Sequence, residues 1–320
     1  MPKYINLIMK NLHKIKKYLI NPVVTLGTFD GVHIGHKALL ERVVERTKAL
    51  NGISIVITYH PHPIEILKKK VYPFLLTEKI KKEQFMKAIG IDYVLWLDFD
   101  VNLAHLTPGE FVKEYLHDQI GAKEIIVGYD WHFGKNRAGD YHLLKKMERE
   151  LDFHVEMVDE VLIDGEIVSS TAIRKYLSEG NIQRANIMLE RNYCIMGTVE
   201  KGEQLGTGFG YPTINLKPIE IRKLYPAIGV YITQVKYAHN MFWGLTNVGT
   251  RPTIDKNNRQ KNIETHILDF NEHIYEQKFE LFFIQKIRNE IEFKSIDDLI
   301  EQIKKDEIYA RNIIEKLNNE

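Results

Sequence analysis

The sequence predicts a parallel α/β domain followed by a β-rich domain that ends in a long helix. Short apolar runs alternate with helical patterns in the first half, short β-like runs dominate beyond residue 193, and the last residues repeat apolar side chains at helical spacing. A length of 320 residues exceeds the size at which a single core stops growing, so two domains are expected. We place them at residues 1–187 and 188–320.

The first half contains apolar runs without strict alternation, as expected for strands that are buried on both faces of a parallel sheet. The runs are Val23–Thr25, Ser54–Thr58, Tyr93–Leu97 and Glu124–Val127. Helical patterns occupy Lys37–Lys48, Glu78–Ile89 and Pro108–His117. Ligand sites in such sheets lie beyond the carboxyl ends of the strands, so the segments that follow these runs are the candidate functional segments.

A glycine-rich segment with two histidines follows the first run and opens a helix. It reads Leu26-Gly27-Thr28-Phe29-Asp30-Gly31-Val32-His33-Ile34-Gly35-His36. Glycines let the backbone approach an anion, and the first N–H groups of a helix attract it. We expect His33 and His36 at the first helical turn, where imidazolium groups can stabilise charge on a transferring phosphoryl group. The alternative is a helix-capping turn whose histidines only pack or face solvent.

Composition and spacing exclude several classes of protein. The P-loop pattern is absent, because its nearest approach, Gly128 to Gly134-Lys135-Asn136, has the wrong spacing and ends in Asn. The 44 basic and 43 acidic residues nearly cancel, which gives no electrostatic case for a nucleic-acid partner. The single cysteine, Cys194, rules out an intrachain disulfide framework and a multi-cysteine zinc site, and it fits a reducing compartment.

The N-terminal stretch Lys10–Ile20 is basic but lacks the apolar core and cleavage site of a signal peptide. No run approaches the roughly 20 apolar residues that a transmembrane helix needs. We therefore expect a soluble cytoplasmic protein with neither a membrane nor a nucleic acid as partner. The sequence leaves homo-oligomerisation open.

Three further segments follow predicted strands or open a predicted helix: Thr58–Pro63, Gly128–Asp140 and Val168–Arg174. Each alone has a simple structural explanation, namely a proline-rigid turn, a glycine-rich loop with a packing tryptophan, and a Ser/Thr helix cap followed by a solvent-facing arginine. Hydroxyl groups at a helix start with an arginine one turn later also suit a triphosphate. All of these segments can face one crevice.

The sequence pattern changes in the second half, from alternating strands and helices to mostly β-like runs. Lys175–Arg191 predicts one or two helices with a break at Gly180-Asn181, and the β-like runs that follow are Cys194–Lys201, Gly229–Val235, Phe242–Asn247, Glu264–Leu268 and Phe279–Ile287. Ser295–Leu317 predicts a helix capped by Ser295, which we expect to plug or cover a barrel.

A glycine-rich loop precedes Pro212-Thr213 and can wrap phosphates. The Thr213 hydroxyl and the Asn215 carbonyl are hard oxygen ligands that suit magnesium. The alternative is a turn and a strand start. The GxGxG pattern at Gly206, Gly208 and Gly210 is weak evidence by itself, because no strand–turn–helix unit surrounds it.

These motifs resemble the HxGH nucleotidyltransferases and, within them, the bacterial bifunctional riboflavin kinase/FMN adenylyltransferase (FAD synthetase) family. The first half carries the resemblance at Gly27–His36, Thr58–Pro63, Gly128–Asp140 and Ser169–Arg174. The second half carries it at Gly202–Leu216, Pro226–Tyr231, Asn247–Thr253 and Glu264–Phe270, and its specific pieces are Pro212–Asn215 and Glu264–His266. The resemblance implies a Rossmann-like nucleotidyltransferase domain followed by a small Greek-key β-barrel riboflavin kinase domain with a C-terminal helix.

The resemblance also implies two ATP-dependent steps, from riboflavin to FMN and from FMN to FAD and pyrophosphate, with Mg²⁺ in both sites. Glu264 would be the general base toward the ribityl hydroxyl of riboflavin, and His33 and His36 would steady the α-phosphate of ATP. We expect His266 to be structural and to lie on the opposite strand face from Glu264. The other candidate binding residues are Gly27, Phe29, Asp30, Gly31, Gly35, His60, Asp130, Arg137, Ser169, Ser170, Thr171, Arg174, Gly206, Gly210, Pro212, Thr213, Asn215, Asn247 and Arg288, with Thr213 and Asn215 as the metal ligands.

Four residues depart from the family pattern: His60 replaces an acidic residue, Glu190 a glycine, and Thr207 and His132 an arginine. These departures leave open a riboflavin kinase with a weakened or retuned adenylyltransferase half, or a non-catalytic flavin-binding sensor. Another HxGH nucleotidyltransferase, acting on pantetheine phosphate or nicotinamide mononucleotide or making a CDP-alcohol, is disfavoured by the kinase-like second half.

Overall fold

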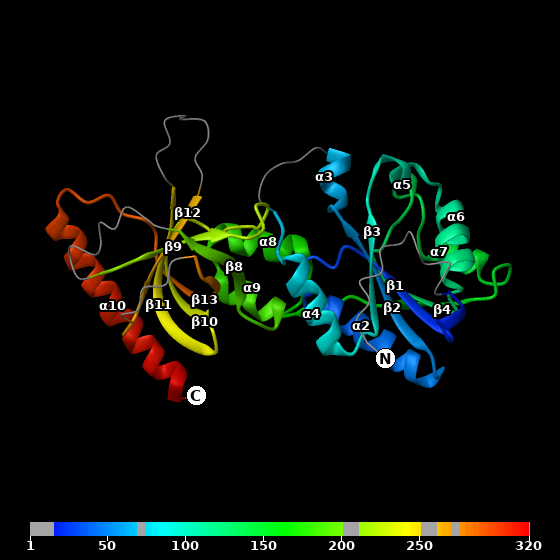
Figure 1. The fold of residues 1–320 in the computed structure, drawn as a ribbon, viewed down its shortest axis with the longest axis horizontal. Coiled ribbons are helices and arrows are strands. Elements are labelled where there is room, and N and C mark those ends of the chain that lie inside the picture. The colour runs from blue at the N-terminus through cyan, green and yellow to red at the C-terminus, as the bar shows by residue number, and fades with distance from the viewer. Residues whose placement is uncertain (1–15, 69–73, 201–210, 251–260, 271–275, 320) are drawn as a thin grey trace. The chain divides into compact units, whose positions relative to one another are not determined.

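The computed structural model describes residues 16–68, 74–200, 211–250, 261–270 and 276–319. The chain forms two compact units. Within the described residues, the first unit comprises 16–68 and 79–169, and the second comprises 74–78 and 170–319. Figure 1 labels the helices and strands of both units.

The first unit contains a five-stranded parallel sheet in the order β3-β2-β1-β4-β5. The strands are β1 (Pro22–Leu26), β2 (Ile53–His60), β3 (Tyr93–Asp98), β4 (Glu124–Gly128) and β5 (His154–Val158), with a separate ribbon of β6 (Leu162–Ile163) and β7 (Glu166–Ile167). The helices are η2 (Lys16–Tyr18), α2 (Ile34–Ala49), α3 (Pro63–Lys68), α4 (Lys79–Ile89), α5 (Val101–His105), α6 (Pro108–Phe111), η3 (Val112–Ile120), η4 (Lys135–Arg137) and α7 (Tyr141–Met147). The parallel α/β prediction is confirmed.

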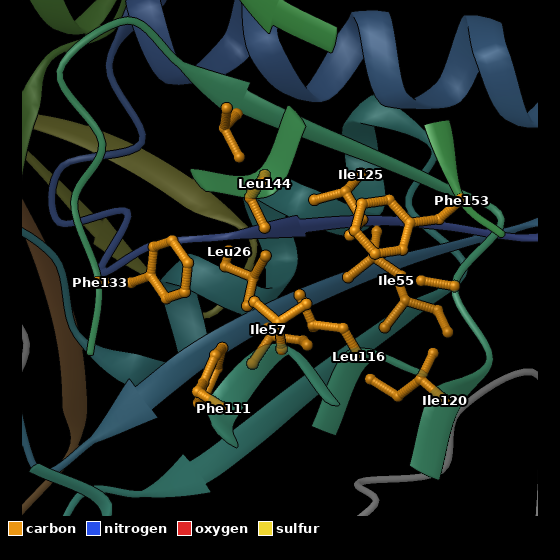
Figure 2. Packing of buried hydrophobic residues seen from close by; sticks show 14 of the residues in the cluster. Leu26, Ile55, Ile57, Phe111, Leu116, Ile120, Ile125, Phe133, Leu144 and Phe153 are labelled. Atoms are coloured by element: carbon orange, nitrogen blue, oxygen red, sulfur yellow. The ribbon is translucent and has the colours of Figure 1, made fainter. Parts of the chain in front are cut away.

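Two hydrophobic clusters cover the two faces of this sheet. Every residue of β1 is buried, and neighbouring residues of the strand enter different clusters, Val23 one and Val24 the other. Helices α2 and α4 supply Leu40, Val43 and Met86, among others, to the cluster of Val23. The other cluster draws on α6, η3 and α7, and Figure 2 shows it with Phe111, Leu116, Ile120 and Leu144 around strand residues such as Leu26, Ile55 and Ile125.

The strand order reverses beside β1. The chain moves outward from β1 to β2 and β3, and then returns to the other side of β1 to form β4 and β5. In an open α/β sheet, the crevice at such a reversal is the preferred ligand site. The loops after β1 and β4, residues 27–33 and 129–140, leave the sheet at this point.

The second unit contains a closed barrel in the order β10-β11-β12-β9-β8-β13. Its strands are β8 (Tyr193–Glu200), β9 (Ile214–Pro218), β10 (Gly229–Tyr237), β11 (Asn240–Thr250), β12 (Lys261–Ile267) and β13 (Lys278–Arg288). Its helices are α8 (Ser170–Glu179), α9 (Ile182–Leu189) and α10 (Ile296–Asn319). The β domain and the helix break at Gly180-Asn181 are confirmed.

Helix α10 lies along the outside of the barrel wall (Figure 1). Ser295 caps it, because the Ser295 hydroxyl accepts the Asp298 N–H at 3.1 Å. Ala310 and Ile314 pack against Ile232 and Leu245. The threonines that follow these two strand residues, Thr233 and Thr246, point to the other side of the strands, where their hydroxyls bond at 2.8 Å. Helix α10 therefore covers the barrel and does not plug it.

A short segment from the first half of the chain, residues 74–78, belongs to the second unit. Leu75 forms a parallel bridge with Lys223, and Leu224 N donates to the Leu75 carbonyl at 2.9 Å. The Lys223 side chain is 1% exposed, and its ammonium donates to Leu76 O at 2.6 Å and to Glu78 Oε2 at 3.1 Å. Glu78 Oε1 in turn accepts the Met196 N–H of β8. This buried ion pair ties the segment to the barrel.

Replacing Lys223 with methionine is expected to destabilise the second unit by about 3–5 kcal/mol, because the Glu78 carboxylate would stay buried without its cation. The matched control is Lys217→Met in the exposed pair with Glu200, which should cost less than about 1 kcal/mol. The measurement is urea unfolding of the full chain with Trp96 and Trp131 replaced by phenylalanine, so that the fluorescence of Trp243 reports on the second unit. Equal midpoints for the two variants would contradict this account.

Candidate active sites

The segment with the two histidines connects β1 to α2. His33 is the N-cap of α2, and its Nδ1 accepts the His36 N–H at 3.3 Å. The two imidazole rings are stacked, with centroids 3.6 Å apart and an interplanar angle of 19°. The structure thus brings His33 and His36 together at the first helical turn. It also shows that His33 caps the helix, so the capping interpretation holds for this side chain.

The cap bond uses one nitrogen of the His33 ring, Nδ1, and Nε2 lies outside this bond. The action of His33 and His36 as imidazolium groups toward a transferring phosphoryl group stays a prediction.

The loop between Gly27 and His33 has an unusual backbone. Phe29 and Val32 have φ values of 46° and 39°, and Gly31 has a φ of 97°. Positive φ is costly for a β-branched residue such as Val32, and strain of this kind persists only where the surroundings enforce it. Phe29 and Asp30 are fully or almost fully buried. The backbone of this loop is therefore held in one conformation.

Gly35 has a packing role that the sequence does not reveal. A Cβ at Gly35 would lie 3.3 Å from two atoms of the His33 ring. The glycine therefore leaves room for the capping imidazole, in addition to any approach of an anion to the backbone.

Two other predicted segments also follow the carboxyl ends of strands. Thr58 ends the buried part of β2, and its hydroxyl donates to the Thr28 carbonyl at 3.3 Å. His60 is exposed, with its ring edge-on to Trp96 at 6.3 Å between centroids. In the loop after β4, Asp130 and Arg137 are exposed.

The loop after β4 is anchored by aromatic packing. Trp131 stacks on the buried Phe133 with centroids 4.4 Å apart, and Phe133 pairs with Gly139 through both of its backbone groups. Asp140 caps α7 by accepting the Leu143 N–H at 2.9 Å. The packing tryptophan is thus confirmed, and Figure 2 shows Phe133 among the buried residues of the core.

The serine and threonine segment opens α8, which begins at Ser170. The division between the two compact units falls between Ser169 and Ser170. Arg174 donates through Nε to the Phe74 carbonyl at 2.9 Å, within the second unit. The placement of Ser170, Thr171 and Arg174 against the histidines therefore stays a prediction.

In the second unit, three candidate residues from separate segments lie side by side. In the register of the barrel, Glu264 of β12 pairs with Asn247 of β11 on one side and with Asn215 of β9 on the other. Directly paired residues point to the same face of a sheet, so the three side chains form a row. Asn215 is 6% exposed. Asn247 donates to Glu290 Oε1 at 3.3 Å, and its buried Oδ1 accepts no hydrogen bond from the described residues.

Asn262 links two members of this row. Its Nδ2 donates to Glu264 Oε1 at 2.7 Å and to Asn215 Oδ1 at 3.2 Å. Sequence reasoning missed Asn262, although its position two residues before Glu264 on one strand places both side chains on the same face. The Glu264 carboxylate is thereby held through one oxygen.

The donor atoms in this row suit a small hard cation. Asn215 Oδ1, the Glu264 carboxylate and the nearby Thr213 hydroxyl are all oxygen ligands. Among the described residues, no group of three or more His, Cys, Asp and Glu could hold a metal alone. Magnesium in nucleotide sites needs only one or two protein ligands besides the phosphates, so these residues fit Mg²⁺.

Two nearby residues have structural contacts. His266 Nδ1 bonds with the Pro212 carbonyl at 2.9 Å, which fastens the segment that carries Thr213. His266 lies two residues after Glu264 and therefore on the same strand face, so the expected opposite face is wrong. Arg288 bonds with both oxygens of Asp306 on α10 at 2.7–3.0 Å, and its role toward a substrate stays a prediction. Gly206 and Gly210 lie outside the described residues.

Comparison with known proteins matches both halves. The family model for FAD synthetase matches residues 15–172, and that for riboflavin kinase matches residues 189–314. A protein of Buchnera aphidicola subsp. Schizaphis graminum named bifunctional riboflavin kinase/FMN adenylyltransferase is 35% identical over 302 residues, which are 93% of this chain and 96% of that protein. The chain belongs to the bifunctional riboflavin kinase/FMN adenylyltransferase family.

A second curated relative and a solved structure are also similar to this chain. The protein of the same name from Escherichia coli strain K12 is 36% identical over 90% of this chain and 91% of its own length. A crystal structure described as a macrolide-efflux protein from Streptococcus pneumoniae aligns with a TM-score of 0.84 and 30% identity, over 93% of this chain and 97% of that chain. In the described part of this chain, no helix combines the length and hydropathy needed to cross a membrane.

Proposed function

We propose that this family member makes FMN in its second unit and FAD in its first. In the first reaction, the ribityl 5′-hydroxyl of riboflavin attacks the γ-phosphorus of ATP and ADP leaves. In the second reaction, a phosphate oxygen of FMN attacks the α-phosphorus of another ATP and pyrophosphate leaves. The alignment of Asn247, Glu264 and Asn215 across three strands is the single observation that supports the kinase assignment most strongly.

In the kinase reaction, Glu264 accepts the proton of the 5′-hydroxyl as the new P–O bond forms. Asn262 holds Glu264 Oε1, which leaves the other carboxylate oxygen to face the substrate. Thr213 and Asn215 would hold Mg²⁺ together with the phosphates of ATP, and the bound cation would supply charge neutralisation at the γ-phosphate. The buried Asn247 Oδ1 is a further acceptor for a substrate hydroxyl.

In the adenylyl transfer, His33 and His36 stabilise charge on the α-phosphate. The His33 ring acts through Nε2, the nitrogen outside the cap bond, and the first N–H groups of α2 add their dipole. Ser169, Ser170, Thr171 and Arg174 hold the phosphates of ATP, and Asp130 lies near adenosine or flavin. Mg²⁺ would enter this half on the phosphates of ATP. The FMN phosphate is the nucleophile, so no covalent enzyme intermediate forms.

Chelation of Mg²⁺ tests the proposal in both halves. Excess EDTA is expected to stop the conversion of riboflavin to FMN and of supplied FMN to FAD, and added Mg²⁺ should restore both. The assay is chromatographic separation of the flavins. Pantetheine phosphate and nicotinamide mononucleotide serve as competing acceptors and should receive no adenylyl group. Adenylylation of either acceptor in preference to FMN would contradict the proposed function.

A further inference from the structure

Lys82 of α4 is a buried lysine to which the proposed mechanism gives no role. Its side chain is 4% exposed, and its ammonium donates to the Thr28 carbonyl at 2.6 Å. A buried ammonium is costly unless it is hydrogen-bonded or paired, so its position calls for a physical reason. The bond to Thr28 supplies one, because Thr28 lies inside the segment that leads to His33 and His36.

The Thr28 carbonyl is an anchoring point for this segment. It accepts hydrogen bonds from the Lys82 ammonium at 2.6 Å and from the Thr58 hydroxyl at 3.3 Å. The next residue, Phe29, has a positive φ, as do Gly31 and Val32. A backbone with this strain relaxes unless its surroundings hold it. The two bonds to Thr28 fasten the loop at the residue where the strained part begins.

Trp96 holds the first part of α4 in place and thereby positions the Lys82 side chain. Its Nε1 donates to Glu83 Oε1 at 2.6 Å, and Glu83 follows Lys82 in the helix. The Lys82 and Lys79 ammonium groups lie 5.3 and 4.5 Å from the centroid of the Trp96 ring, within the range of a cation–π interaction. Lys79, however, is exposed, and its ammonium has no described bond to the loop.

The loop in turn determines the positions of the His33 and His36 rings. The Phe29 ring meets the His36 ring edge-on at 5.2 Å between centroids. Val32 immediately precedes His33, whose side chain caps α2. A shift of the loop at Thr28 would therefore move both imidazoles, and displacements of about 1 Å can cost a hundredfold in rate.

We propose that Lys82 is a positioning residue for adenylyl transfer: its ammonium holds the Thr28 carbonyl, and through it the Phe29–Val32 loop that places His33 and His36. Lys82 acts through the backbone and touches neither substrate nor reacting atoms. This assignment rests on the proposed function of the first unit. It adds a residue that lies outside the sequence segments from which the candidate site residues were named.

The test compares Lys82→Met with Lys79→Met in the full chain. Lys82→Met should lower kcat for FAD formation from supplied FMN by about tenfold to a hundredfold. Lys79→Met removes the other ammonium over Trp96 and should change that kcat less than about twofold. Riboflavin phosphorylation by the same preparations is the internal control and should stay at the wild-type rate. Lys82→Arg, which keeps the charge, should recover part of the loss.

Hydrogen exchange separates positioning from general destabilisation and from failure of the proposed function. In Lys82→Met without substrates, the peptide covering residues 26–36 should exchange faster, while β2 and β4 keep their protection. Lost protection in β2 and β4 would make Lys82 a structural residue and overturn the proposal, as would wild-type exchange or wild-type FAD formation. If the wild-type chain made no FAD, the proposed function would fail, and exchange would still decide whether Lys82 holds the loop.

Discussion

Replacing Glu264 with glutamine is expected to lower kcat for FMN formation by about 10²–10⁴-fold, because an amide cannot take the proton of the riboflavin hydroxyl. Glutamine keeps the shape of the side chain, and its Oε1 can still accept the hydrogen bond from Asn262. The row of Asn215, Glu264 and Asn247 should therefore stay in place. The measurement is FMN formation at saturating riboflavin, ATP and Mg²⁺, with the products separated by chromatography.

The first unit supplies the control for this variant. Conversion of added FMN to FAD should proceed at the wild-type rate in Glu264→Gln, which shows that the preparation is folded and active. FMN formation within a few-fold of the wild-type rate would remove Glu264 from the role of general base.

The second large effect is expected for His36→Ala, which should lower kcat for FAD formation by about 10²–10³-fold, the usual cost of losing one donor to developing charge. His36 is a cleaner choice than His33, because the His33 side chain caps α2 and its loss alone would cost about 1 kcal/mol of stability. The measurement is FAD formation from supplied FMN and ATP.

Two controls accompany the His36 variant. Riboflavin phosphorylation by the same protein should be unchanged, and His142→Ala, which removes an exposed imidazole of the same unit, should keep the wild-type rate of FAD formation. Undiminished FAD formation in His36→Ala would leave the stacked pair with packing and capping roles only.

Local patterns predicted most of the fold. The apolar runs that became β1 to β4 are buried strands, and the break at Gly180-Asn181 separates two helices. Four strands escaped prediction, each for a physical reason, and two of them, β6 and β7, have only two residues each, too few to show a period. β5 alternates charged or polar residues with apolar ones at the edge of the sheet, and β9 is short, carries Asn and Lys, and ends at Pro218. Neither β5 nor β9 presents the continuous apolar run of a doubly buried strand.

In the candidate sites, too, local sequence patterns predicted some contacts and missed those that depend on distant parts of the chain. His33 and His36 could be placed together from sequence, because three residues span less than one helical turn. The row of Asn215, Glu264 and Asn247 depends on the register of three strands, which spacing along the chain does not determine. Lys82 was missed for a similar reason, because its bond to Thr28 joins residues 54 positions apart.

The buried pair of Lys223 and Glu78 shows that the compact units of the structure do not coincide with the residue ranges that the family models match. Residues 74–78 pack with the second unit, although the riboflavin kinase family model begins at residue 189. A boundary between residues 187 and 188 therefore stays a prediction.

The most direct test of the central claim is a time course of the purified chain with riboflavin, ATP and Mg²⁺, followed by chromatography. We expect FMN to appear first and FAD to follow as FMN accumulates, because the product of the second unit is the substrate of the first. FMN that never becomes FAD would confine activity to the barrel and direct attention to His60. Formation of neither product would contradict the account of both units.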